Sequence, residues 1–243
     1  MESESAAARP QVQRPSPSAL PALWEPLQAC AAPTRERLVA AAQGVTLAAG
    51  DLLVEAGGAP ERVVVLSEGV LRVFHVGAES QFTVKLLRAP NAVGLVEVLT
   101  GNPYAGSVEA LVPTAGIVVP ARAVREEVER DDAFARAVLR DIAAKFEGTI
   151  RSTRHLGFDD AETRLVRVLL EYAEHFGRPA TGGGGLVVRH ALSLERLSRE
   201  VGVTRRSIDR AVADLTRAGL VERSDKGWLV LKDPAALRSR LDR

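Results

Sequence analysis

The chain has 243 residues, of which 46% are hydrophobic and 26% are charged. This composition can fill a packed core and excludes disorder along the whole length. The longest uncharged run, Leu38 to Gly50, is shorter than the roughly 20 apolar residues of a membrane-spanning helix, so we expect no membrane partner. The single cysteine excludes an internal disulfide, an all-cysteine iron–sulfur cluster and a zinc finger, and we expect no metal or cofactor.

The N-terminal residues lack the basic segment and the apolar stretch of a secretory signal, so the cytoplasm is the expected location. The net charge of +1 conceals an asymmetry along the chain. Residues 186–243 hold 13 Lys and Arg against 8 Asp and Glu, whereas residues 1–185 hold 19 against 23. A basic terminal module on an acidic body suggests nucleic acid as the partner of that module.

The first half of the chain indicates a β domain preceded by short helices. Residues 1–20 are rich in Ala, Pro, Ser and Glu and predict a disordered arm. Short helices are expected over about residues 22–42. Between Val45 and Val119, strand-length apolar runs alternate with glycines, which is typical of an antiparallel sandwich or roll. We therefore expect a β-roll domain over residues 21–131 and the α+β fold class.

From Asp132 the hydrophobic period becomes helical, which predicts one long helix over residues 132–158. A narrow stripe with spacings of three and four is what a two-helix dimer contact uses, and we favour that role. The alternative is that the helix packs back on the sheet. The stripe consists of Phe134, Val138, Ile142, Phe146, Thr149 and Thr153.

A different architecture is predicted for residues 159–243. Asp159 and Asp160 offer an N-cap for a helix that extends to Phe176, and Gly177 takes the place of a C′ glycine. Residues 179–185 are expected to form a turn or linker.

Further along, the pattern is that of two helices joined by a short turn. Ser193 is a candidate cap for a first short helix, and Gly202 ends it. Thr204 is then a second cap, and the helix that follows, 205–218, is ended by Gly219. Two helices joined by a short glycine-containing turn are the signature of a helix-turn-helix. Two short strands, 220–221 and 228–231, then predict a two-stranded wing.

The polar face of the second helix is a candidate DNA-binding surface. The N-terminal residues of such a helix meet base edges in the major groove, where Arg pairs with guanine. The alternative is that these charges form a solvated face, but the caps, the wing and three arginines together favour DNA. Thr204 and Ser207 are short enough to bind phosphates. The candidate residues are Thr204, Arg205, Arg206, Ser207, Asp209 and Arg210.

The segment from Gly202 to Arg210, inside a winged helix that follows a β roll and a long helix, resembles the Crp/Fnr family of bacterial transcription regulators. The resemblance covers roughly residues 47–231 and implies a homodimer bound to a two-fold DNA site. Family members commonly carry Arg-Glu-x-x-x-Arg on the recognition helix. Arg205 and Arg210 match this pattern, but Arg206 replaces the Glu, so the base sequence read should differ. In the β roll the similarity depends on Gly50-Asp51, Gly57, Ser67-Glu68-Gly69 and Gly94.

The resemblance also implies an effector pocket. Family members that bind cyclic AMP use a Gly-Glu pair, an Arg-Ser pair and a Thr-Ser pair. Here the ribose Glu is replaced by Leu95 and the phosphate Arg by Gly106. A buried phosphodiester needs a cation or several donors, so cyclic AMP is disfavoured. An unknown effector that is more apolar or neutral, or a pocket closed by its own side chains, stays open. The candidate pocket residues are Gly94, Glu97, Ser107 and Thr149.

Other chemistries have less support. His75 is the only histidine of the sensory domain, which disfavours haem. The glycines at 182–185 lack the Gly-Lys-Ser/Thr of a phosphate loop, and no pattern indicates an enzyme. We expect a dimeric, sequence-specific transcription regulator, the alternative being a ligand-binding or protein-interaction module whose winged helix contacts a protein. RNA polymerase would be a partner of an activator, but nothing in the sequence marks a surface for it.

Overall fold

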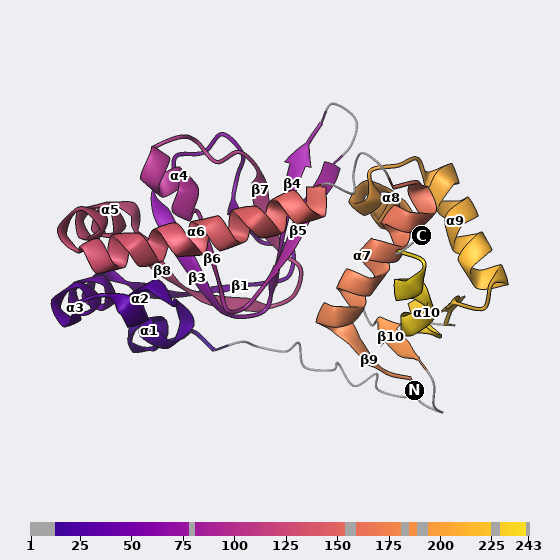
Figure 1. The fold of residues 1–243 in the computed structure, drawn as a ribbon, viewed down its shortest axis with the longest axis horizontal. Helices are drawn as coiled ribbons and strands as arrows, with labels where there is room; N and C mark the ends of the chain where they lie inside the picture. Colours follow the sequence, from indigo (N-terminus) through magenta and orange to yellow (C-terminus); the bar gives the residue numbers. More distant parts are fainter. Residues whose placement is uncertain are drawn as a thin grey trace, which may run out of the picture. The chain divides into compact units, whose positions relative to one another are not determined.

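The computed structural model describes residues 13–77, 81–153, 159–180, 185–188, 194–224 and 229–241 (Figure 1). The chain divides into two compact units. The first comprises residues 1–73 and 87–144, and the second comprises residues 74–86 and 145–243. The sequence predicted a long helix over residues 132–158 as a separate segment between two domains. The division between the two units instead falls inside that helix, between residues 144 and 145.

The first unit begins with short helices that contribute to its core. They are η1 (Pro17–Ala19), α1 (Leu20–Leu23), α2 (Pro26–Ala29) and α3 (Ala32–Ala41). Leu20 and Leu27 are fully buried, and the ring of Trp24 meets that of Phe134 edge-on with centroids 5.7 Å apart. The disordered arm predicted for residues 1–20 is therefore wrong for Pro17–Leu20, which are helical and end in a buried leucine. Residues 1–12 lie outside the described chain.

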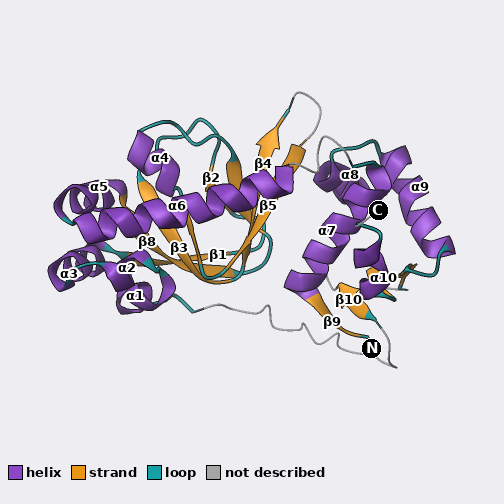
Figure 2. Ribbon diagram, in the orientation of Figure 1, coloured by secondary structure: helices purple, strands orange, loops and turns teal. Residues whose placement is uncertain are grey.

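Among the described residues, eight strands in two antiparallel sheets form the β roll that the sequence predicted (Figure 2). One sheet has the order β1-β8-β3-β6 and the other β2-β7-β4-β5. Helix α4 (Leu95–Thr100) connects β6 and β7. The strands are β1 (Gln43–Leu47), β2 (Leu52–Val54), β3 (Arg62–Glu68), β4 (Val70–Val76), β5 (Gln81–Arg88), β6 (Asn91–Val93), β7 (Ser107–Ala110) and β8 (Thr114–Pro120).

Strand β3 shows why the apolar runs are continuous. Val63 and Val65 pack in the cluster that includes the N-terminal helices. Val64 and Leu66 point the other way, into the cluster between the two sheets. Because successive side chains of a strand alternate between faces, a strand covered on both sides is apolar at every position.

Helices α5 (Ala121–Arg130) and α6 (Asp132–Thr153) follow the roll, with Asp131 between them. The Asp131 carboxylate accepts hydrogen bonds from the backbone N–H of Ala133 and Phe134 and so caps α6. It also accepts one from the N–H of Ala31 at 2.8 Å. These backbone hydrogen bonds, that of Ala31 first, hold the pKa of Asp131 below its ordinary value. One carboxylate thus joins the start of α6 to the N-terminal helices.

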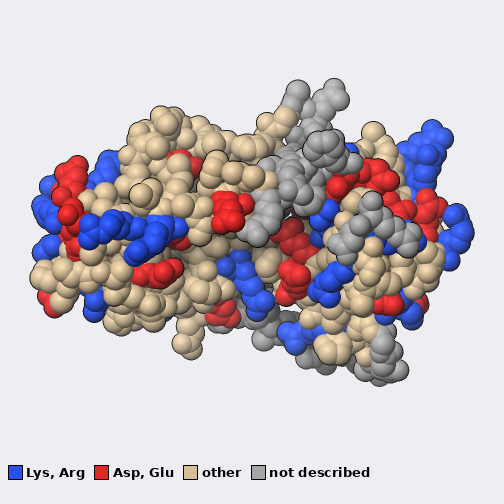
Figure 3. Space-filling view, in the orientation of Figure 1, with Lys and Arg blue, Asp and Glu red and all other residues tan. Residues whose placement is uncertain are grey.

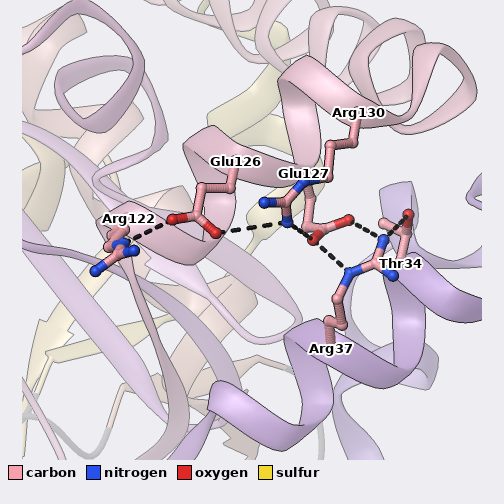
Figure 4. Close-up of polar contacts among 6 residues, drawn as sticks. All are labelled: Thr34, Arg37, Arg122, Glu126, Glu127 and Arg130. Carbon is pink, nitrogen blue, oxygen red and sulfur yellow. Dashed lines mark hydrogen bonds and ion pairs between the residues drawn. The ribbon is translucent and has the colours of Figure 1, made fainter.

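Ion pairs join α3 to α5 (Figure 4). The guanidinium of Arg37 donates to both oxygens of Glu127, and Arg130 donates to one of them at 3.0 Å. Glu127 is buried, with 2% of its surface exposed. On the same helix, Arg122 pairs with Glu126 at 2.6 Å.

The second unit contains the C-terminal helices and a four-stranded sheet of order β11-β12-β10-β9. Of these four strands, the sequence predicted only β11 and β12, the two strands of the wing. The elements are α7 (Ala161–Phe176), β9 (Gly177–Pro179), β10 (Leu186–Val188), α8 (Leu194–Val201), α9 (Arg205–Arg217), β11 (Val221–Arg223), β12 (Leu229–Leu231) and α10 (Pro234–Ser239).

The ends of α7 confirm one prediction and correct another. Asp160 is the N-cap, because its side chain accepts from the Thr163 N–H at 2.8 Å. Gly177 is not a left-handed C′ glycine, since its φ is −66° and it begins β9. A side chain at this position would have its Cβ 2.2 Å from the carbonyl oxygen of Ala173, so the glycine permits a close approach. Of the predicted linker, 179–185, residues 181–184 lie outside the described chain.

Candidate nucleic-acid interface and effector site

Helices α8 and α9 form the predicted helix-turn-helix. Gly202 ends α8 with a left-handed φ of 70°, and its N–H and that of Val203 both donate to the carbonyl of Ser198. These bonds satisfy one of the carbonyls that the end of a helix leaves unpaired. Ser193, the predicted cap of α8, lies outside the described residues. The apolar sides of the two helices are buried through Leu197, Val201, Ile208, Val212 and Leu215.

Thr204 caps α9 as the sequence predicted. Its hydroxyl oxygen accepts from the Ser207 N–H at 3.2 Å and lies 2.9 Å from the Ser207 hydroxyl. Thr204 is exposed and Ser207 is partly exposed. The start of α9 therefore offers two hydroxyls next to the N–H groups of a helix N-terminus, an arrangement that favours a phosphate.

The first two turns of α9 also carry exposed charges. Arg205, Arg206, Asp209 and Arg210 are all exposed, and Figure 3 shows Lys and Arg atoms along the α9 side of this unit. No described residue forms an ion pair with these three arginines. Arg217 at the far end of α9 differs, because it pairs with Asp214 at 2.7 Å. The cations at the helix start are thus available to an external anion or base edge.

A buried polar group fixes α8 against α7. The Tyr172 hydroxyl donates to the Glu200 carboxylate at 3.2 Å, and Arg196 lies 3.6 Å from the same oxygen. Tyr172 and Glu200 are 1% and 4% exposed. Burial, and then the nearby Glu200 charge, raise the pKa of Tyr172 far above its ordinary value. The orientation of the helix-turn-helix on α7 is therefore held by hydrogen bonding as well as by apolar packing.

In the first unit, the segment that carries the candidate effector-pocket residues Gly94 and Glu97 is packed against its own chain. Gly94 is the N-cap of α4 with φ 85°, and a Cβ there would lie 2.7 Å from the Arg62 carbonyl oxygen. Leu95, which replaces the ribose-binding Glu, is 3% exposed and belongs to the core. Glu97 lies in the first turn of α4 and is partly exposed.

Tyr104 closes the loop that follows α4, and sequence reasoning missed it. Its backbone exchanges two hydrogen bonds with Gly57 and Gly58, and its hydroxyl donates to the Arg62 carbonyl at 3.1 Å. Ser107, expected in the pocket, is buried, and its hydroxyl oxygen accepts from the Ala56 N–H at 3.0 Å. The signal that could have found Tyr104 is its place in the sequence, a large aromatic residue two positions before Gly106.

Thr149 belongs to the second unit, where its hydroxyl donates to the Lys145 carbonyl of the same helix at 3.0 Å. Of the predicted helix seam, Phe134 and Val138 are instead buried in the core of the first unit, and Ile142 packs against it. The first half of the stripe thus packs back on its own domain.

A different apolar face of α6 is exposed. Leu139, Phe146 and Ile150 are 66%, 64% and 51% exposed, and their spacing of seven and four places them on one helical face. Phe146 is the predicted seam residue that belongs to this face. The side chain of Thr153 lies outside the described residues.

Comparisons with known proteins cover both halves of the chain. Residues 45–131 match the model of the cyclic nucleotide-binding domain, and residues 163–240 match the model of the Crp-like helix-turn-helix domain. The chain belongs to the Crp/Fnr family of transcription regulators.

Curated Crp/Fnr relatives are distant in sequence. The chain is 22% identical over 77% of its length to the CRP-like cAMP-activated global transcriptional regulator of Mycobacterium tuberculosis, of which 84% is covered. It is 27% identical over 68% of its length to the global nitrogen regulator of a Nostoc species, of which 74% is covered. The printed names describe the first of these relatives as a transcriptional regulator and the second as a nitrogen regulator.

The same fold is found among solved structures. A Crp/Fnr-family regulator from Eubacterium rectale aligns with a TM-score of 0.78 at 15% identity, over 91% of this chain and all of the other. Within the described residues, no helix is long and apolar enough to cross a membrane.

Proposed function

We propose that this Crp/Fnr chain binds double-stranded DNA sequence-specifically as a homodimer through α9. The observation that carries the proposal is the set of exposed arginines at 205, 206 and 210, next to the Thr204 cap. Arginine donates two hydrogen bonds to the O6 and N7 of guanine, a discrimination of about 1–3 kcal/mol. The three arginines read bases, and Asp209 lies on the same surface of α9. Thr204 and Ser207 bind phosphates.

The second copy packs on the exposed face of α6. Leu139, Phe146 and Ile150 extend along about three turns, and three large apolar side chains so exposed in one stripe favour burial against a like helix. Two-fold symmetry then places the two α9 helices at half-sites about 34–36 Å apart on the DNA. Phe146 belongs both to this contact and to the one expected from sequence. Leu139 and Ile150 take the place of Phe134 and Val138, which are buried in the first unit.

Cyclic AMP does not control this protein in our proposal. The M. tuberculosis relative is cAMP-activated by name, but here Leu95 and Gly106 provide neither a ribose acceptor nor a phosphate cation. Tyr104 and Ser107 already hydrogen-bond to their own chain in this segment. A buried phosphodiester without a cation would cost several kcal/mol.

A protein partner for the winged helix is the alternative function, and salt dependence separates the two. Phosphate contacts release counterions, so the logarithm of DNA affinity falls linearly with that of salt concentration, with a slope of about −0.9 per contact. We expect such a slope for short duplexes carrying a selected motif. A DNA affinity that does not change with salt concentration, or no affinity for duplex DNA, would favour the protein contact.

A further inference from the structure

Asp209 is the only acidic residue among positions 204–210, the start of the helix to which the proposed function assigns the reading of bases. It follows Arg205 by four positions and Arg206 by three, so it lies on the same side of α9 as both. The neighbouring Ile208 is fully buried, whereas Asp209 is exposed. Asp209 therefore belongs to the surface that carries the arginines.

No local contact accounts for a carboxylate at this position. The spacing from Arg205 and Arg206 permits an ion pair within the helix, yet Asp209 forms none with any described residue. Asp214 on the same helix differs, because it pairs with Arg217 at 2.7 Å across a spacing of three. The helix dipole would stabilise an acidic group in the first turn of α9, but Asp209 lies beyond that turn. The carboxylate is thus available to an external donor.

The chemistry of the major groove limits what that donor can be. An ionised carboxylate accepts hydrogen bonds and donates none, and the phosphates of DNA repel it. Among the base edges in the major groove, only the 4-amino group of cytosine and the 6-amino group of adenine donate. Adenine places the acceptor N7 beside its amino group, whereas cytosine has a C–H there. A carboxylate therefore favours cytosine and is repelled by the acceptor oxygens of guanine and thymine.

We propose that Asp209 determines specificity at one base pair of each half-site by accepting a hydrogen bond from the 4-amino group of a cytosine. The charged acceptor strengthens this hydrogen bond, and its repulsion from guanine and thymine discriminates against those bases. The arginines at 205, 206 and 210 read guanines at other positions. This inference rests on the proposed binding of DNA through α9, and it adds a base that the arginines do not read.

Two substitutions of Asp209 test the proposal. Binding to a library of single-base variants of the selected motif is measured for the full-length parent, Asp209→Asn and Asp209→Ala. We expect the parent to prefer cytosine at one position of each half-site by about tenfold or more. Asp209→Asn should transfer this preference to adenine, because an amide donates to N7 and accepts from the 6-amino group. Asp209→Ala should lose the preference there and keep it at the guanines that the arginines read.

A base analogue tests the hydrogen bond itself. The base 2-pyrimidinone lacks the 4-amino group, and it replaces the cytosine of the motif in a short duplex. The same replacement at a cytosine outside the motif is the control for weakened base pairing. The parent should lose about tenfold in affinity beyond this control, and Asp209→Ala should lose no more than the control. Because both changes remove the same contact, their effects should not add.

Asp214→Asn is the matched control for charge, because Asp214 lies on the same helix and pairs with Arg217. It should change the affinity for all sequences alike and leave the base preference unchanged. Asp209 variants with the parent's preference at every position would overturn the proposal. A loss confined to the guanine positions would also overturn it, since Asp209 would then only orient the arginines. A parent without any sequence preference would instead contradict the proposed function, so the two failures are distinguishable.

Discussion

The guanidinium of Arg37 on α3 donates to both carboxylate oxygens of Glu127 on α5, each at 2.7 Å. This bidentate geometry is the strongest form of an Arg–carboxylate contact. It joins the helices that precede the β roll to those that follow it. Because Glu127 is buried, the pair contributes to the stability of the first unit in a pH-dependent way.

The pH dependence has a definite sign. The hydrogen bond from Arg37, more than any other contact, lowers the pKa of Glu127 from its ordinary 4.5. A depressed pKa in the folded state means that the stabilisation is present above pH 4.5 and is lost as pH falls through the lower folded value. We expect Glu127→Gln to lower the melting temperature at pH 7, and this deficit to shrink at pH values below 4.5.

Glu126→Gln is the matched control, because its partner Arg122 lies on the same helix and is 89% exposed. Exposed pairs of this kind contribute little to stability. Melting curves of both variants between pH 3 and 7 test the prediction. A loss for Glu126→Gln equal to that for Glu127→Gln would contradict it.

Phe134 tests the corrected placement of the helix seam. It is fully buried and touches Trp24 edge-on. Replacing a buried Phe by Ala typically costs about 3–5 kcal/mol. We expect Phe134→Ala to reduce the free energy of unfolding by that amount in denaturant titrations, whatever the protein concentration. A loss of dimer without a loss of stability would instead return Phe134 to the subunit contact.

Phe146 tests the proposed subunit contact. A glutamate at this position would face the glutamate of the second copy near the two-fold axis. The two carboxylates would lose water and repel each other. We expect Phe146→Glu to sediment as a monomer under conditions in which the parent is a dimer. Val96→Glu is the control, since Val96 is also exposed but lies on α4. A dimeric Phe146→Glu variant would place the contact elsewhere.

Arg210 tests the reading of bases. We expect Arg210→Ala to relax the preference at one base pair of each half-site by about 1–3 kcal/mol, since the bidentate contact with guanine is lost. Arg217→Ala removes an exposed arginine from the far end of the same helix, where it pairs with Asp214, and should keep the parent's preference. Binding to a library of single-base variants measures both. A full preference retained by Arg210→Ala would show that this side chain reads no base.

Local patterns predicted the second unit well. The caps at Asp160 and Thr204 are set by residues within three positions, and the apolar sides of α8 and α9 follow the helical period. The strands β9 and β10 were missed because each has three residues and gains stability only by pairing with β12 and with each other. Such pairing is not encoded in any short window of sequence.

Contacts between distant residues explain the other differences. The stripe on α6 has a helical period whether it faces a partner or its own core, and only the packing of Trp24 on Phe134 shows which. Leu20 appeared to belong to a polar arm because its neighbours are Pro, Ser and Ala.

The most direct test of the account is selection of bound fragments from sheared genomic DNA by the purified protein, with and without cyclic AMP. The account predicts an enriched two-fold motif in both conditions, with half-sites one helical turn apart. A motif that appears only with cyclic AMP would contradict our view of the effector segment. Fragments with no shared motif, bound equally well in both conditions, would contradict sequence-specific binding through α9.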